Sequence, residues 1–174
     1  MVYLIIFLIF ALILLLWQIS QIISVIGGTP AVYAKDETIR EVFKLAGLER
    51  GQAVVDLGCG NARSLIIAAK KFKAKGIGVE ISPFYFLLSK IKILLSGESK
   101  NIKIIFGRFQ KAESYLKSAD VVYLYLFSKA LNEIEKWLFN SVSEKTKIVS
   151  FGFKFAKRKP VLAITNPTLY LYRK

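Results

Sequence analysis

The chain has no histidine and only one cysteine, Cys59, among its 174 residues. The lack of histidine excludes Ser-His-Asp triads, histidine metal sites and a histidine proton shuttle. A single cysteine excludes an intrachain disulfide and a structural zinc site built from several cysteines, so we expect no metal. This composition suits chemistry that depends on aligning an already activated reagent more than on acid–base side chains.

Charged side chains are missing from the first 34 residues. The segment 2–26 is almost wholly apolar, with polar side chains only at Gln18, Ser20, Gln21 and Ser24. About 20 apolar residues in a helix span a bilayer, so this segment predicts a single-pass transmembrane helix. A cleaved signal peptide is the alternative, ending near Ala34, but the basic start and short apolar core of such peptides are both missing.

All 26 Lys and Arg residues follow this segment, and Lys35 and Arg40 lie close to it. The positive-inside rule therefore places the rest of the chain on the cytoplasmic side of the membrane. The net charge of +14 fits an anionic lipid surface, nucleic acid or a solubilising role. Basic clusters at 70–75 and 154–159, next to an anchored domain, favour anionic lipid. No nucleic-acid-binding module accompanies the charge, so a nucleic-acid partner is not expected.

The remaining residues predict one α/β domain. Gly27-Gly28-Thr29-Pro30 breaks the first helix, which divides the chain into an anchor at 1–28 and a domain at 29–174. About 140 residues suffice for one domain and not for two. We expect Asp36, Ser82 and Ser128 to cap their helices, with Pro83 at the first helical position after Ser82. Phe151, Phe153 and Phe155 should alternate along a strand with one packed face or form a membrane-facing lip. Helices are expected at 36–46, 62–72, 82–95 and from 128, strands at 53–57, 76–80, 102–106, 120–126 and 147–151, and a closing antiparallel pair at 160–165 and 169–172.

The most informative segment is Val54-Val55-Asp56-Leu57-Gly58-Cys59-Gly60-Asn61, which reads as a strand, a glycine turn and the start of a helix. A ligand can approach the backbone at Gly58 and Gly60 because glycine has no Cβ. The free amides at the helix start add hydrogen-bond donors. Glu80 closes the next strand, where an acid can accept both hydroxyls of a ribose. The pattern predicts a site for a nucleoside-containing cofactor.

Two common nucleotide motifs do not match this turn. The dinucleotide fingerprint needs a third glycine where this chain has Arg63, and a Walker A loop needs Gly-Lys-Ser/Thr, which does not follow Gly60. The segment Asp-Leu-Gly-Cys-Gly instead resembles motif I of class I S-adenosylmethionine-dependent methyltransferases. That resemblance implies a Rossmann-like sheet and S-adenosyl-L-methionine as cofactor. It also implies that the methionine end of the cofactor lies at Asp56, Gly58, Cys59 and Gly60, and the ribose at Glu80 and the adjacent Ile81.

Two regions of the chain complete the expected site. Many relatives carry an acid after the third strand that contacts adenine; here Arg108 stands at that position, and we expect Phe109 to stack near the base. The acceptor should enter near the carboxyl end of the fourth strand, where aromatic rings could guide an alkylammonium group. Plain core packing is the alternative for at least one of the two tyrosines. The pocket candidates are Tyr123, Tyr125, Phe127 and Ser128.

The domain also resembles a smaller group, the short protein-lysine methyltransferases of archaea and bacteria. These are related to membrane-anchored mitochondrial enzymes that act on the ATP synthase c subunit and the adenine nucleotide translocase. The matching pieces are residues 55–63, 121–126, Asn132, 137–138 and 148–151, with departures at Asn61, Ala62, Ser128, Phe151 and the segment 31–35. The resemblance implies a membrane-anchored protein-lysine N-methyltransferase. The alternatives are a tethered cofactor-binding module with altered or lost activity, and a methyltransferase of a small lipophilic acceptor.

Overall fold

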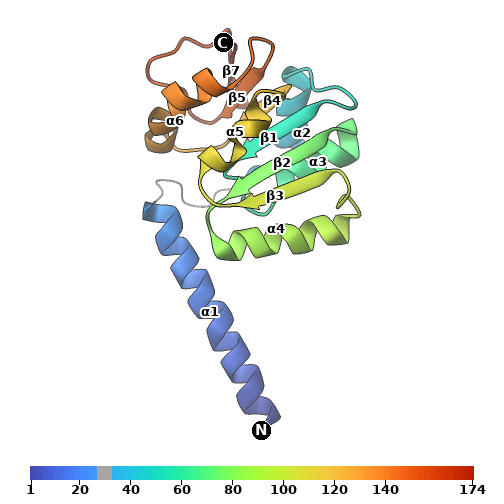
Figure 1. Cartoon of the computed structure of the whole chain (residues 1–174), viewed down its shortest axis with the longest axis vertical. Helices are drawn as coiled ribbons and strands as arrows, with labels where there is room; N and C mark the ends of the chain where they lie inside the picture. The colour runs from blue at the N-terminus through green and yellow to red at the C-terminus, as the bar shows by residue number, and fades with distance from the viewer. Residues whose placement is uncertain (27–32) are drawn as a thin grey trace.

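The computed structural model describes residues 1–26 and 33–174. The predicted linker at 27–30, the first part of the segment at 31–35 and the predicted domain boundary at 28/29 lie outside the described residues. Figure 1 shows one long helix that leaves an α/β domain. Its elements are α1 (Val2–Ile26), α2 (Asp36–Leu45), β1 (Ala53–Leu57), α3 (Arg63–Phe72), β2 (Lys75–Glu80), α4 (Pro83–Ser96), β3 (Ile102–Phe106), η1 (Phe109–Ala112), α5 (Glu113–Leu116), β4 (Val121–Leu124), α6 (Ser128–Ser141), β5 (Lys147–Phe151), β6 (Leu162–Thr165) and β7 (Thr168–Tyr172).

The seven strands form one sheet in the order β3-β2-β1-β4-β5-β7-β6. The first five pair in parallel, and β7 pairs antiparallel with both β5 and β6. Strands β1 to β3 extend to one side, and the chain then returns to place β4 on the other side of β1, so the strand order reverses between β1 and β4. Ligands of open α/β sheets bind outside the carboxyl ends of the strands at such a switch point. This is the predicted Rossmann-like sheet, and the predicted closing pair is confirmed as β6 and β7.

Two apolar layers cover the sheet. One contains buried side chains of α2, α3 and α4, among them Phe43, Leu65 and Ile93, packed against β1 and β4. The other contains α6 and the short η1–α5 segment, with Leu131 and Leu116 fully buried. Side chains alternate along each parallel strand between these layers, so Val54 belongs to the first and Val55 to the second.

Helix α3 lies close to strand β2 because β2 carries Gly76 and Gly78. A Cβ added at Gly78 would lie 2.6 Å from the Sγ of Cys59 and 2.8 Å from Leu65, and one at Gly76 would lie 3.3 Å from Leu65. In dinucleotide-binding folds the third glycine of the turn allows this close packing. Here the glycines of the neighbouring strand allow it.

Two predicted caps differ from the structure, and one is confirmed. Helices α2 and α6 each begin at the residue expected to cap them, so Lys35 and Phe127 occupy the cap positions without a side-chain hydrogen bond. The Ser82 cap of α4 is present, with its hydroxyl accepting from the amide of Tyr85 at 3.2 Å. The short helices η1 and α5 were not predicted, because four residues are too few to show a helical period.

The prediction that Phe151, Phe153 and Phe155 share one strand is wrong, because β5 ends at Phe151. The three rings have different partners. Phe151 packs on Tyr125 with 4.6 Å between ring centroids, and Phe153 packs on Phe127 at 4.9 Å. Phe155 is fully buried against Phe139 and Tyr172, so these rings are part of the packing of the domain and form no lip.

Helix α1 is a candidate membrane span by length and composition, over Val2–Ile22. Its apolar side chains are exposed from Val2 to Ile22. Among the described residues, the carboxyl-terminal part of α1 contacts the start of α4. There the amide of Phe84 donates to the Ser20 hydroxyl at 3.1 Å, and the Gln21 amide donates to the Tyr85 hydroxyl at 3.5 Å.

Candidate functional site

A cleft opens at the carboxyl ends of β1 and β4, at the switch point of the sheet. The space within it is about 420 Å³, which includes solvent at its open mouth. Its lining combines the end of β1 and the glycine turn with residues from α2, the segment before it, α3 and the end of β4. The lining residues are Tyr33, Ala34, Ile39, Asp56, Gly58, Cys59, Gly60, Asn61, Arg63, Ser64, Tyr123 and Tyr125.

The turn after β1 needs glycine at two positions. Gly58 and Gly60 have φ values of +85° and +53°, in the region that favours glycine. A Cβ added at Gly60 would meet no atom within 4 Å, so open space lies against its bare backbone. The turn is held to β2, since the amides of Gly58 and Cys59 both donate to the carbonyl of Val79, at 2.9 and 3.0 Å.

Asp56 is the buried acid of the cleft, with only 3% of its surface exposed. Its carboxylate accepts a hydrogen bond from the hydroxyl of Ser64, in the first turn of α3. Burial raises the pKa of Asp56 to about 7, the Ser64 hydrogen bond opposes this shift, and the charge of Glu80 adds to it. A cationic ligand group beside Asp56 would stabilise its ionised form. The environment therefore suits the recognition of an ammonium group.

Glu80, the last residue of β2, contacts the same glycine turn. Its Oε2 accepts from the amide of Gly60 at 2.8 Å, and its Oε1 accepts from the amide of Ser82 at 2.7 Å. Burial raises the pKa of Glu80, and these backbone hydrogen bonds oppose the rise. Each carboxylate oxygen has a further lone pair for a sugar hydroxyl. Glu80 lies next to the lining of the cleft and converges with Asp56 on the glycine turn.

Tyr123 and Tyr125 both face the layer that contains α2 and α3, because residues two apart on a strand point to the same side. Tyr123 is 3% exposed and packs on Phe43 with 5.5 Å between centroids, so it is part of the core as well as the cleft wall. Tyr125 follows the end of β4 and is half-buried. Of the two, Tyr125 is the more exposed and the better placed to contact a ligand.

The other predicted site residues lie outside the cleft lining. Phe109 lies near the turn, 3.7 Å from a Cβ added at Gly58, and Ile81 directly follows Glu80. Phe127 packs on Phe153, and Ser128 is exposed at the start of α6. Cys59 does line the cleft, and burial raises the pKa of its thiol well above the ordinary value, which makes it a poor nucleophile.

Six lining residues were not predicted: Tyr33, Ala34, Ile39, Asn61, Arg63 and Ser64. Ser64 could have been found from its place one turn into the helix that follows the glycines. Arg63 pairs with Asp36, which joins the starts of α3 and α2 beside the cleft. Tyr33 and Ala34 come from the segment before α2, and their position has no signal in the local sequence.

Comparison with protein families decides the assignment. Residues 56–162, more than half of the chain, match the model of the ANTKMT methyltransferase domain. The chain belongs to this family. A protein-lysine N-methyltransferase of Saccharolobus islandicus (strain REY15A) is 28% identical over 156 residues, which cover 86% of this chain and 96% of that protein. A ribosomal protein L11 methyltransferase of Yersinia pestis is 31% identical over 84 residues, only 28% of its length.

Solved structures show the same fold. An RNA methyltransferase from Salinibacter ruber in complex with S-adenosyl-L-homocysteine superposes with a TM-score of 0.76 at 25% identity, covering 82% of this chain and 93% of that one. A methyltransferase from Geobacter sulfurreducens in complex with S-adenosyl-L-homocysteine has a TM-score of 0.58 at 20% identity, covering 67% and 48% of the two chains. This ANTKMT-family chain is therefore an S-adenosylmethionine-dependent methyltransferase.

The cleft of this methyltransferase fits its cofactor. The open space beside Gly60 admits a ligand to the backbone, and the buried Asp56 offers a partner for the ammonium of an amino acid. Glu80 offers lone pairs for ribose hydroxyls beside the same turn. Arg63, the arginine of the lining, pairs with Asp36.

Proposed function

We propose that this chain is a membrane-anchored methyltransferase that uses S-adenosylmethionine to methylate protein lysine. The supporting observation is its likeness to the Saccharolobus protein-lysine N-methyltransferase over nearly the full length of that protein. The cleft adds chemical support, since it combines a buried acid with tyrosine rings at its wall. Aromatic rings attract alkylammonium groups through their negative faces.

In this proposal the residues of the chain bind the cofactor, align the acceptor with its methyl group and desolvate the acceptor. The bound cofactor supplies a methyl group already activated on a sulfonium, so no histidine is needed. Asp56 would hold the amino-acid end of the cofactor, Glu80 the ribose, and Ile81 and Phe109 would border the nucleoside. Tyr125, with Tyr123 behind it, would orient the acceptor lysine. The pKa of a lysine falls when it is desolvated next to a cation, which helps it to reach the neutral form that attacks.

The proposal includes the membrane. Helix α1 has 25 residues and no charged side chain, and none of its most apolar window is buried against the domain. We propose that residues 1–28 anchor the chain in a single pass and that the methyltransferase domain, 29–174, lies on the cytoplasmic side, where Lys35 and Arg40 follow the span. A protein of the same membrane is then a natural substrate.

A second acceptor class has its own support. The Salinibacter structure is described as an RNA methyltransferase, and this chain carries a net charge of +14, which suits a polyanion. Part of that charge is structural, since Arg158 lies 3.7 Å from Glu135 and 3.8 Å from the ring of Phe139. We favour lysine because the Saccharolobus match covers more of both proteins at higher identity.

The test is methyl transfer by the full-length chain reconstituted in vesicles. With methyl-labelled S-adenosylmethionine, we expect label in lysine of membrane proteins, identified by mass spectrometry, and far less label with Asp56→Asn at the same cofactor concentration. Label in RNA alone or in lipid alone would overturn the lysine assignment and select the other acceptor. Binding of S-adenosylhomocysteine without transfer to any fraction would support a tethered module without activity.

A further inference from the structure

Helix α4 presents an apolar face that the domain does not cover. Leu87, Ile91, Leu94 and Leu95 are 57%, 47%, 71% and 81% exposed. Their spacing of four and then three or four residues places them along one side of the helix. The opposite side carries the buried Tyr85, Ser89 and Ile93. Scattered exposed leucines are ordinary, but a continuous stripe on one helix indicates a contact surface.

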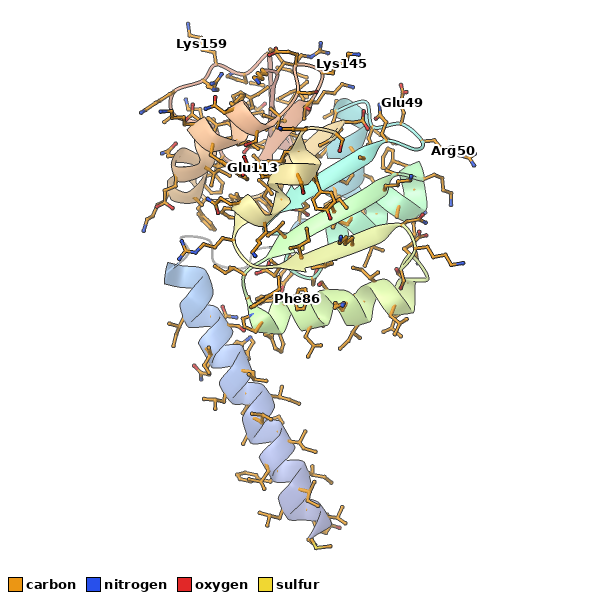
Figure 2. The ribbon with its side chains drawn as sticks, viewed as in Figure 1. Glu49, Arg50, Phe86, Glu113, Lys145 and Lys159 are labelled. Carbon is orange, nitrogen blue, oxygen red and sulfur yellow. The ribbon has the colours of Figure 1, made fainter. Side chains whose placement is uncertain are left out.

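The position of this stripe relative to α1 indicates what covers it. Ser20 and Gln21 of α1 contact the start of α4, so the two helices meet at one corner of the domain. In Figure 1, α4 runs across the edge of the domain from which α1 extends, and α1 continues away from the domain on that side. Figure 2 shows side chains projecting from the outer face of α4 in the same direction.

The length of α1 places α4 at the level of a membrane surface. From Val2 to Ile19, before the first contact with α4, the helix rises about 27 Å at about 1.5 Å per residue. The hydrocarbon core of a bilayer is about 30 Å thick. If this part of α1 spans the core, the corner where Ser20 meets Phe84 lies at the boundary between acyl chains and headgroups.

The polar residues of α4 fit the same boundary. Lys90 and Lys92 are exposed beside the apolar stripe, and the Nζ of Lys90 lies 5.6 Å from the ring centroid of Phe86. Lysines can extend from such a position to anionic headgroups while leucines enter the acyl region. Phe86 packs on the half-exposed Phe106 of β3, which widens the apolar surface. The basic cluster at 154–159 does not serve this contact, because Lys159 lies at the end of the domain far from α1 (Figure 2).

We propose that α4 lies in the plane of the membrane surface, with Leu87, Ile91, Leu94 and Leu95 inserted into the lipid. This proposal rests on the membrane insertion of α1 proposed above and adds a second attachment. One span alone would attach the domain to the membrane at a single place. Two attachments set the height of the cleft above the membrane and the direction in which it opens. Tyr33, which lines one wall of the cleft, follows the proposed anchor closely in the chain. The acceptor would then be presented close to the membrane surface.

Quenching of tryptophan by brominated lipids tests the contact in the full-length chain in vesicles of phosphatidylcholine and phosphatidylglycerol. Three chains are compared: Trp137→Phe, which keeps only Trp17 as a reporter of α1; Ile91→Trp in a Trp17→Phe, Trp137→Phe background; and Lys129→Trp in that background. Lys129 is exposed on α6 and serves as the matched control. Binding of S-adenosylhomocysteine checks the fold of each.

We expect strong quenching of the position 91 probe by bromine near the headgroup end of the acyl chains, several times that of the position 129 probe. Trp17 lies about 4.5 Å along α1 from the corner at Ser20, so it should be quenched by the same lipids. Quenching of Trp17 without quenching at position 91 would overturn the α4 contact while leaving the anchor intact. No quenching of Trp17 would reject the anchor, and the α4 proposal with it. A blue-shifted but unquenched probe at position 91 would show that a second protein chain covers α4 instead.

Discussion

At the scale of single residues, Asp56 links the stability of the fold to cofactor binding. Its pKa is raised to about 7 because the carboxyl group is buried, whereas the unfolded chain has the ordinary value of 3.8. Between these two values the folded protein holds a proton that the unfolded chain has released. The contribution of Asp56 to the free energy of unfolding therefore falls as the pH rises through this window. Burial alone favours the protonated carboxyl group of Asp56, whereas a bound cationic group favours the ionised carboxylate.

We predict that Asp56→Asn weakens binding of S-adenosylhomocysteine by about ten- to a hundredfold, since hydrogen bonds to charged groups contribute about 1.5–3 kcal/mol. In the natural chain, affinity should increase as the pH rises from one unit below 7 to one unit above, by up to about tenfold. The variant should lose that pH dependence. Isothermal titration measures both quantities. Asp120→Asn is the control, because Asp120 accepts the amide of Ala53 at the far end of β1; equal effects of the two substitutions would contradict the role of Asp56.

Ala62 is a second residue with an unusual state, since it has φ of +61° at the start of α3 and is fully buried. A left-handed conformation at a non-glycine residue is unfavourable by about 1–2 kcal/mol. We predict that Ala62→Gly changes the free energy of unfolding little, because release of this strain offsets the lost methyl burial of about 0.8 kcal/mol. Ala68→Gly is the matched comparison, equally buried but inside α3. It should lose about 1.5–2 kcal/mol, from helix propensity and methyl burial together. Chemical unfolding in mild detergent compares the two, and similar losses would refute the assignment of strain to Ala62.

At the scale of elements, the contact between α3 and β2 holds the cofactor turn in place. Gly78 lies under Cys59 and Leu65, and the turn itself is hydrogen-bonded to Val79. Any side chain at position 78 would push outward on the residues that form the floor of the cleft. The packing of this helix on this strand therefore affects the shape of the binding site directly.

We predict that Gly78→Ala lowers the free energy of unfolding by about 1–3 kcal/mol through overpacking. It should also weaken S-adenosylhomocysteine binding, because the added methyl displaces Cys59. Gly76→Ala is a graded control, since its added Cβ would lie 3.3 Å from Leu65 and farther from the turn. Thermal unfolding and titration of both variants should rank Gly78→Ala as the more damaging in each measurement. The reverse ranking would show that the glycines are not what permits the close approach.

At the scale of the whole molecule, the two ends of the domain differ in character. Helix α1 and the exposed face of α4 lie at one side, while Lys145 and Lys159 lie at the opposite end (Figure 2). A membrane at the α1 side leaves that basic end in water. This difference between the two ends agrees with the proposed membrane attachment at the α1 side.

Membrane topology can be tested in cells that express the chain. We predict that it stays in the membrane fraction after alkaline carbonate washing, with its first residues intact. Trypsin should cut after Lys35 or Arg40 in inverted vesicles, where the cytoplasmic face is accessible, and not in intact cells. Mass spectrometry of the purified chain provides the second readout. A mature protein that begins after Ala34 would establish a signal peptide and remove the anchor.

Much of the fold could be predicted because its signals are local. Strands 53–57, 102–106 and 147–151 were predicted with the bounds that the structure gives them, since each is an apolar run between polar or glycine-containing turns. The fourth strand was predicted to reach residue 126, yet it ends at Leu124. Its apolar run continues because Leu126 turns into the core after pairing with β5 has ended. An apolar pattern indicates which residues are buried, but not where the hydrogen bonds between strands end.

The sequence by itself determined the order of strands and helices, the apolar anchor segment, and the acid–glycine turn with its partner Glu80. These follow from neighbouring residues, through side-chain period, glycine conformation and the absence of charge. Only the tertiary structure decided that Tyr33 and Ser64 share a cleft with Asp56, and that the bare face of α4 lies beside α1. These contacts depend on the strand order of the sheet and on how helices pack across it. Residues far apart in the chain come together only when the whole core forms.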